Sequence, residues 1–280
     1  MHNLSIFRFF LPGLAAFGCL SGTPVLADES SRVHPFLSSR YSIQLGGFFP
    51  THNVRLRVDG SAGIEGTDID FDETFDMRRG GRTLAMEFTW RFGKKWSARM
   101  QYFNVDQTEK AVLEEDIEWG DEIIEAGSSV TAGTDFELAR VFFARSFDST
   151  PNLDYGIGIG IHWLEIGAFI KHDFLTSFGE TSSVAASGPL PNIGTWYYYS
   201  PSEKWYVGGR LDWFEASVGE YDGGIMNIAV GVNYQMFKNF GVGVKYQDFR
   251  FKVDVDKSDW HGEAKLSFAG AFLYLSGSWK

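Results

Sequence analysis

Apolar and polar residues alternate along most of this chain, and the alternation limits its fold more than any other property of the sequence. Neighbouring side chains of a β-strand point to opposite faces, so strict alternation predicts strands with one apolar face and one small or polar face. In the clearest segment the apolar set is Ile228, Val230, Val232, Tyr234 and Met236, with Ala229, Gly231, Asn233 and Gln235 between them. The pattern recurs in the segments that begin at Leu84, Trp96, Tyr155, Trp205 and Phe240.

The order of residues along the apolar faces predicts contact with lipid. Aromatic residues stand at the ends of these faces and aliphatic residues in the middle, as in strands whose aromatic side chains lie at the two membrane interfaces. A soluble barrel shows the same alternation with its apolar face inward, so alternation alone leaves both alternatives open. Beyond residue 30 no apolar run is long enough for a transmembrane helix.

The first 27 residues are predicted to be a secretory signal peptide. An apolar run over residues 9–20 precedes the small residues of Val25-Leu26-Ala27, so we expect cleavage before Asp28. Cys19 is the one cysteine of the chain, and its removal would exclude both a disulfide framework and a thiolate zinc site. We expect residues 28–39 to form an N-terminal periplasmic segment and residues 40–280 to form a barrel.

Turn residues divide the barrel region into ten predicted strands. The strands are 40–50, 82–92, 95–105, 135–147, 153–168, 190–200, 204–217, 224–236, 239–253 and 262–279. Short polar turns alternate with the long acidic segments 64–80, 106–134 and 171–188, which predicts periplasmic turns and extracellular loops. Segments 53–59 and 66–72 also have strand character. We interpret them as an extracellular extension of the first hairpin; if each crossed the membrane, the strand count would be twelve.

Composition limits the classes of function. The 280 residues include 25 Lys and Arg against 36 Asp and Glu, a net charge of -11, which argues against nucleic-acid binding because that needs a basic patch. Hydrophobic residues make up 44% and aromatic residues 16%, too much for a disordered chain.

The last predicted strand resembles the C-terminal signal of bacterial outer-membrane β-barrel proteins. Residues 268–279 end on the aromatic Trp279, with Leu275, Leu273 and Ala271 at preceding outward positions, and Lys280 follows where this family usually ends. Residues 66–72 also look like a segment of uncharacterised barrels of this class. The resemblance implies an antiparallel transmembrane β-barrel in the outer membrane of a Gram-negative bacterium. It also implies contact with outer-membrane lipid and lipopolysaccharide and insertion by the barrel-assembly machinery, but no particular activity.

Polar residues on the predicted inward faces are candidates for a network in the lumen. A barrel of about ten strands is narrow, and buried charges are costly unless they pair. We therefore expect a plugged, polar lumen, with a narrow porin for small solutes as the alternative. The candidate network is Glu87, Arg91, Arg99, His162, Arg210, Asp212 and Lys245, and Asp154, Asn233, Gln235, Arg250, Lys252, Glu263 and Lys265 also occupy predicted inward positions.

Two acidic groups in the predicted outer loops are candidate metal ligands. They are Asp68, Asp70 and Asp72 in one loop and Asp254, Asp256 and Asp259 in another. Carboxylate oxygens suit Ca²⁺ or Mg²⁺, although the second group lacks the turn glycine and the final bidentate acid of a calcium-binding loop. We expect a solvated acidic surface and no cofactor, with cation bridging to lipopolysaccharide as the sharper hypothesis.

Evidence for catalysis in the sequence is confined to one pair. Outer-membrane proteases of the omptin kind use an Asp–His pair at the outer rim, and His172-Asp173 stands in a predicted outer loop. No flanking motif matches that family, and the His and Ser spacing of lipid A deacylases is absent. We therefore predict a non-enzymatic outer-membrane protein with a structural or surface-interaction role, and a rim hydrolase at this pair as a further alternative.

Overall fold

The computed structural model describes residues 33–59, 66–75, 77, 83–119, 122–147, 150–172, 181–218, 221–256 and 261–280. The predicted signal peptide, Asp173 and Asp259 lie outside these ranges. Within them, no helix has both the length and the apolar character to cross a membrane.

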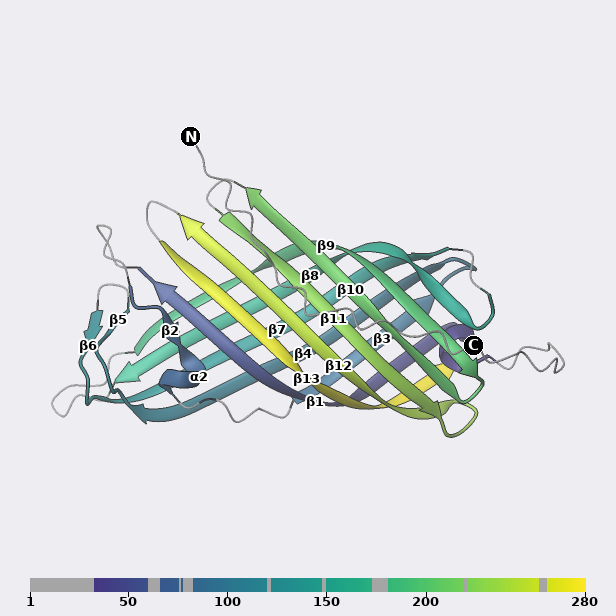
Figure 1. Ribbon diagram of the computed structural model, residues 1–280, viewed down its shortest axis with the longest axis horizontal. Coiled ribbons are helices and arrows are strands. Elements are labelled where there is room, and N and C mark those ends of the chain that lie inside the picture. The colour runs from purple at the N-terminus through teal and green to yellow at the C-terminus, as the bar shows by residue number, and fades with distance from the viewer. Residues whose placement is uncertain are drawn as a thin grey trace, which may run out of the picture. The chain divides into compact units, whose positions relative to one another are not determined.

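Ten long strands of the described chain form one closed antiparallel sheet (Figure 1). They are β1 (Tyr41–Val58), β3 (Thr83–Arg91), β4 (Trp96–Val112), β7 (Ser129–Ser146), β8 (Leu153–His172), β9 (Thr181–Ser202), β10 (Trp205–Val218), β11 (Tyr221–Gln235), β12 (Phe240–Asp256) and β13 (His261–Trp279). The sheet closes where β13 pairs with β1, from Tyr41 opposite Trp279 to Val58 opposite Gly262. The predicted ten-strand barrel is confirmed, and a twelve-strand count is wrong because residues 53–58 continue β1.

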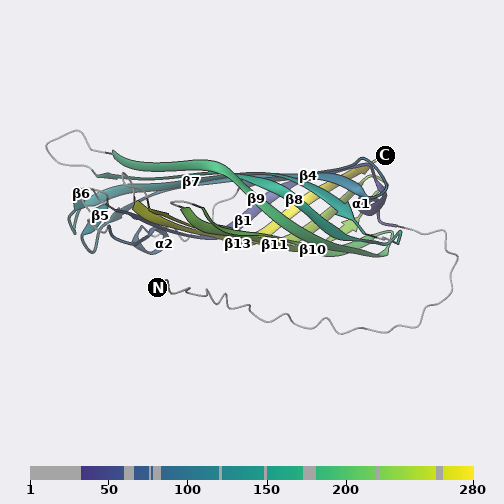
Figure 2. The ribbon, with the colours of Figure 1, turned by 90° about the horizontal axis from the view of Figure 1, so that it is seen from above.

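Short elements occupy the two ends of the barrel (Figure 2). At the end that holds the short turns lies α1 (Pro35–Ser38). At the other end are β2 (Ile69–Asp70), α2 (Phe71–Thr74), β5 (Ile117–Trp119) and β6 (Glu122–Ile124).

The segment 66–72 is only partly the predicted extension of the first hairpin. Asp70 and Ile69 pair with Arg55 and Leu56 of β1, but the chain turns into α2 directly afterwards. The Asp70 side chain accepts hydrogen bonds from the backbone N–H groups of Asp72 and Glu73, which satisfies free donors at a helix start.

The strands are longer than the sequence predicts, and they extend further towards the end of the barrel opposite the short turns. β4 and β7 stay paired up to Val112 and Ser129, so both ends of the predicted loop 106–134 are strand. Outward positions there are polar, as at Asp106, which faces Asp135. The apolar outward face therefore ends before the hydrogen-bonded pairing of the two strands does. A paired segment with polar outward residues looks like a loop in the sequence.

The outer surface of the barrel carries an apolar band. Aliphatic side chains such as Ile159 and Leu275 are 66% and 67% exposed, and Trp96, Trp205 and Trp163 are about half exposed. Apolar area of this extent on a single chain calls for a non-aqueous environment. The band has the aromatic borders expected of a lipid-facing surface.

Candidate functional site in the barrel lumen

The half of the lumen away from the short turns is filled by aromatic rings. Phe136 on β7 has its ring centroid 4.3 Å from that of Phe268, 5.6 Å from that of Phe249 and 5.9 Å from that of Phe103. All four side chains are almost completely buried. Because these residues come from strands around the barrel, the cluster crosses the lumen and leaves an apolar barrier to ions.

A lid of short elements continues this apolar cluster at the outer end. Phe71 of α2 packs against Phe75 and against Trp119 of β5, with centroid distances of 5.1 and 5.9 Å. The backbone N–H of Thr67 donates to the Glu118 carbonyl, and the Glu118 N–H donates to the Thr67 hydroxyl, both at 2.9 Å. The lid is therefore tied together by hydrogen bonds between two loops and anchored by three buried aromatic side chains.

A charged network fills the middle of the lumen. Lys245 Nζ lies 2.5 Å from Glu87 Oε2. Arg210 donates through Nη1 to Asp212 Oδ2 at 2.7 Å, and Arg140 donates through Nη2 to Asp212 Oδ1 at 2.7 Å. The charges that meet inside the barrel thus come from four strands, β3, β7, β10 and β12. Such pairing is expected because an isolated buried charge is costly.

Neutral amides extend this network to other strands. Arg210 Nη2 donates to Gln101 Oε1 at 2.6 Å, and Gln101 Nε2 donates to Gln247 Oε1 at 2.8 Å. Lys245 Nζ also donates to Gln44 Oε1 at 2.8 Å. These amides connect β1, β4, β10 and β12 across the lumen.

His162 is buried where the charged network meets the apolar cluster. Its Nε2 lies 4.0 Å from Asp212 Oδ2 and 3.4 Å from Asn227 Nδ2. Its ring centroid is 6.1 Å from that of Phe249. The side chain has no exposed surface, so in this arrangement it is a packed polar residue with no path to a substrate.

A second charged group lies nearer the short turns. Asp154 Oδ2 is 3.6 Å from Nη2 of both Arg91 and Arg99. Asp154 Oδ1 accepts hydrogen bonds from Ser146 Oγ at 2.6 Å and from Trp196 Nε1 at 3.2 Å. Arg99 also lies over the Trp196 ring, 4.0 Å from its centroid, a cation–π contact.

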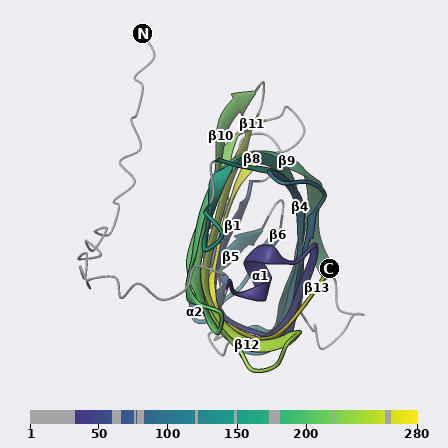
Figure 3. The ribbon, with the colours of Figure 1, turned by 90° about the vertical axis from the view of Figure 1, so that its right-hand side faces the viewer.

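The helix α1 lies in the lumen at the short-turn end, where Figure 3 shows it inside the ring of strands. Beside it a hollow of about 560 Å³ is lined by Leu37, Arg91 and Asp154 among others. Phe36 stacks on Tyr206 with 4.5 Å between centroids and 5° between planes, and meets Tyr198 edge-on at 5.8 Å. The His34 N–H donates to Ser200 Oγ at 3.1 Å, and Arg91 Nη1 donates to the Ser39 carbonyl at 3.3 Å.

His34 also caps the helix that it precedes. Its Nδ1 accepts a hydrogen bond from the Phe36 N–H at 3.1 Å, so the ring must be neutral at that nitrogen. Burial lowers the pKa of His34 from 6.5 to about 4. The docked helix therefore holds an uncharged histidine at neutral pH.

The structure brings the candidate lumen residues together in two groups. Glu87, Arg210, Asp212, Lys245 and His162 lie in the middle network, and Arg91 and Arg99 lie with Asp154 near the short turns. Asn233 and Gln235 are buried as well.

Four further residues with predicted inward positions point outward instead. Tyr246 is 52% exposed and Phe249 is fully buried, so Arg250 and Lys252 share the outward face of Tyr246. Likewise Lys265 and Glu263 lie on the face opposite the buried Phe268. These positions belong to the extracellular part of the strands, where the outward face changes from apolar to polar.

Sequence reasoning missed Arg140, which is 3% exposed and central to the network. The signal was present, because Arg140 alternates with Val141 and Phe143, which are 41% and 54% exposed on the outer face. Two further rings face inward, those of Trp196 and Tyr198, whereas Tyr197 and Tyr199 are exposed on the outside. A run of four aromatic residues conceals which of them face lipid.

The candidate cation ligands are mostly engaged by the protein. Asp70 Oδ2 accepts from Asn53 Nδ2 and Arg55 Nε, both at 3.0 Å, and Asp72 Oδ2 accepts from the Val54 N–H at 2.9 Å. Burial would raise the pKa of Asp70, but the hydrogen bonds from Asn53 and the Glu73 N–H together with Arg55 lower it.

The second acidic group is only partly described. Asp254 pairs with Lys252 at 2.9 Å, and the side chain of Asp256 lies outside the description. In the described part of the chain no three His, Cys, Asp or Glu side chains are grouped as a metal site. Cation bridging therefore stays a hypothesis, which a calcium titration followed by thermal unfolding would test.

The predicted catalytic pair lies at the edge of the described chain. His172 is the last residue of β8, while its side chain and Asp173 are outside the description.

Comparison with known proteins identifies the fold of the chain but not its family. No family model matches the chain, and no curated protein matches it. The outer-membrane protease OmpT from Escherichia coli superposes with a TM-score of 0.58 at 12% identity, covering 85% of this chain and 96% of that one. The chain has the fold of a bacterial outer-membrane β-barrel. The closed sheet and its apolar outer band place this barrel in the outer membrane of a Gram-negative bacterium.

Other outer-membrane barrels align with lower scores. Ail of Yersinia pestis has a TM-score of 0.27 at 11% identity, covering 84% of this chain and 97% of that one. The translocator domain of NalP from Neisseria meningitidis has a TM-score of 0.40 at 8% identity, covering 86% and 89%. The likeness to OmpT is one of fold at 12% identity, and a fold does not by itself decide the activity of this barrel.

Proposed function

We propose that this protein is a non-conducting outer-membrane barrel that serves as a rigid scaffold for an extracellular surface. The observation that supports this function best is the filling of the lumen at three levels. α1 and its aromatic partners occupy the short-turn end, the charged network crosses the middle, and the ring cluster with its lid closes the outer end. A small solute would have to displace buried ion pairs and a well-packed aromatic core, and both are costly.

Planar-bilayer recording of the purified, folded protein tests this proposal. Heat-modifiable migration on a gel would establish that the protein is folded, and an established porin in the same bilayer would control for insertion. We expect no steady single-channel steps from this barrel. Steps of defined size would contradict the proposal and favour the narrow porin.

The outward surface above the apolar band supports a role in contact with lipopolysaccharide. On β1, β12 and β13 this surface carries the basic side chains of Arg55, Arg250 and Lys265, which are between 43% and 48% exposed. Each is also paired with a carboxylate, that of Asp70, Asp248 or Glu263, with which a phosphate group would compete. On β4, β7 and β8 it carries acidic side chains, with Asp106 opposite Asp135 and Glu137 opposite Glu165. Phosphate groups of lipopolysaccharide would be attracted to the basic side and repelled by the acidic side.

A further inference from the structure

The buried charges of the lumen do not balance. Between α1 and the ring cluster, the described strands place five basic side chains inside the barrel and only three carboxylates, an excess of two positive charges with His162 neutral. The basic side chains are Arg91, Arg99, Arg140, Arg210 and Lys245, and the carboxylates are Glu87, Asp154 and Asp212. Uncompensated charge in such an interior is strongly unfavourable.

Several guanidinium donors of this set are buried without a hydrogen-bond partner. They are Arg91 Nη2, Arg99 Nε, Arg99 Nη2 and Arg140 Nε. Arg99 and Arg140 are only 7% and 3% exposed, and an arginine stays charged and offers only donors. The nearest carboxylate oxygen to Arg99, on Asp154, is 3.6 Å away, beyond hydrogen-bond range. These N–H groups therefore lack an acceptor.

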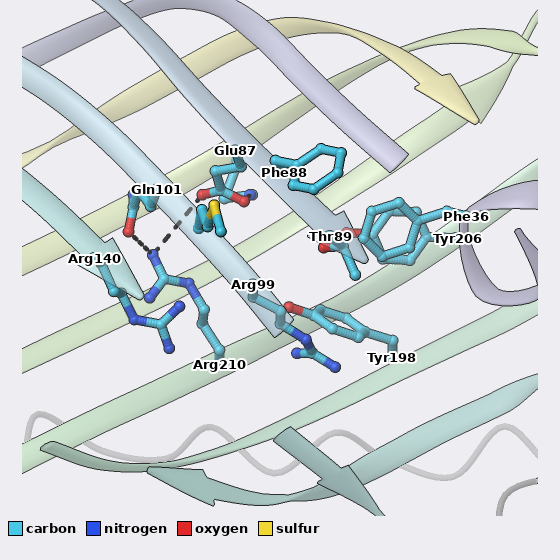
Figure 4. Close-up of a pocket in the computed structure, with 12 residues that line it drawn as sticks. Phe36, Glu87, Phe88, Thr89, Arg99, Gln101, Arg140, Tyr198, Tyr206 and Arg210 are labelled. Atoms are coloured by element: carbon cyan, nitrogen blue, oxygen red, sulfur yellow. Dashed lines mark hydrogen bonds and ion pairs between the residues drawn. The ribbon is translucent and has the colours of Figure 1, made fainter. Parts of the chain in front are cut away.

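A small void lies beside Arg99 and Arg140, which carry three of these donors. It measures about 20 Å³ and is lined by Arg99, Arg140, Arg210, Lys245, Gln101 and Glu87 together with aromatic side chains. Figure 4 shows Arg140 and Arg210 beside each other, with the Arg99 side chain directed towards Tyr198. A void of this size holds one water-sized species.

We infer that this void binds one small inorganic anion of the halide class, such as chloride. An anion supplies the missing acceptor and also removes one of the two excess charges, whereas a water molecule would supply only the acceptor. Glu87 is the one carboxylate among the described residues of the lining. Its Oε2 accepts from Lys245, and its Oε1, which accepts no hydrogen bond, lies 3.8 Å from Arg210 Nη2. The four basic side chains around the void therefore outnumber the repelling group. The site does not depend on the proposed scaffold role, because it needs only a folded barrel.

Thermal unfolding of the detergent-purified full barrel tests this site. The chloride concentration is raised at constant ionic strength, with gluconate replacing chloride because it is too large for the void. We expect the unfolding midpoint to rise with chloride and to saturate. Bromide should reproduce the rise, and its anomalous diffraction signal in a crystal should lie beside Arg99. A midpoint that is equal in chloride and gluconate, or a water without anomalous signal in the void, would overturn the inference.

Two variants check that the effect arises at this place. Arg99→Met removes two of the three unpaired donors beside the void and should abolish the chloride dependence, while Arg145→Met on the outer face should retain it. Should Arg99→Met fail to fold, Gln101→Glu supplies a fixed carboxylate at the same wall. That variant should fold with a midpoint that no longer depends on chloride. Chloride dependence that persists in the folded Gln101→Glu barrel would contradict the site.

Discussion

Lys245 on β12 reaches Glu87 on β3 across the lumen, with Nζ 2.5 Å from Oε2, although the two residues are 158 positions apart in the chain. In the sheet the two strands are separated by β13 and β1. The ion pair therefore joins strands that share no backbone ladder. Lys245 also donates to Gln44 on β1 at 2.8 Å, so three strands meet at one ammonium group.

Replacing Glu87 by Gln should destabilise the barrel more than the loss of a surface pair would. The change leaves Lys245 and Arg210 without their shared carboxylate, and removing one partner of a buried pair costs about 3 to 5 kcal/mol. Urea unfolding of the refolded protein in detergent micelles measures the difference. The double variant Glu87→Gln with Lys245→Met should regain most of the loss, since it removes the stranded charge. Equal stability of the single variant and the wild-type protein would contradict the assigned role of the pair.

Gly194 and Gly188 on β9 offer a matched pair of substitutions. A Cβ at Gly194 would press on Asp212 Oδ1, the oxygen that accepts from Arg140, whereas a Cβ at Gly188 meets no atom within 4 Å. Gly194→Ala should therefore lower the free energy of unfolding by about 1 to 3 kcal/mol, in the range of other overpacked sites. Gly188→Ala should change it little. Parallel unfolding curves of the two variants test the difference, and equal losses would argue against a tightly packed network.

The lid should depend on Trp119. This side chain is 2% exposed beneath the outer loops, and removing a buried Trp costs about 3 to 5 kcal/mol in well-packed cores. Trp119→Ala should leave the barrel folded but make the outer loops sensitive to protease added to intact cells. Ile123→Ala in the adjacent β6 is the control, because Ile123 is 67% exposed. A lid that resists protease in the Trp119→Ala variant would show that the ring does not anchor it.

Alternation allowed the barrel to be predicted where one face meets lipid. Segments such as Ile157 to Trp163 carry glycine or polar residues on the other face, so the two faces differ in every residue. The prediction weakens where both faces are aromatic, as at Phe142 and Phe143, of which the first is buried and the second exposed. The ring cluster in the lumen was missed for another reason. Phe136 stands between the exposed residues Asp135 and Glu137, so in this outer part of the barrel the apolar side chains point inward and the polar ones outward.

The lid and the helix α1 in the lumen could not be predicted from the sequence for a different reason. α1 and α2 have four residues each, which is too short for a helical repeat of apolar positions. Their places are set by contacts with distant strands, such as Phe36 on Tyr206. The pairing of Glu87 with Lys245 also depends on barrel closure, because the β13–β1 pairing leaves only two strands between β12 and β3.

Lipopolysaccharide binding should depend on which side of the barrel is altered. The double variant Arg55→Ser with Lys265→Ser removes two outward basic side chains that face each other on β1 and β13. It should bind less lipopolysaccharide when the purified barrel is mixed with it and analysed by native mass spectrometry. Asp135→Ser with Glu137→Ser on the acidic side is the matched control and should bind at least as much as the wild-type protein. The same loss in both variants would contradict a basic contact surface.

Acid should loosen the helix that lies in the lumen at the short-turn end. The pKa of His34 is about 4 in the docked helix against 6.5 when free, so the undocked form takes up a proton first as the pH falls. Docking is therefore strongest above pH 6.5 and weakens as the pH falls towards 4. A fluorescent label on Ser38→Cys, an exposed position of α1, would report the change. His34→Asn keeps an acceptor for the Phe36 N–H but does not titrate, so its emission should stay constant over the same range. If the emission of the wild-type and His34→Asn proteins changes alike with pH, a group other than His34 titrates, and the prediction is contradicted.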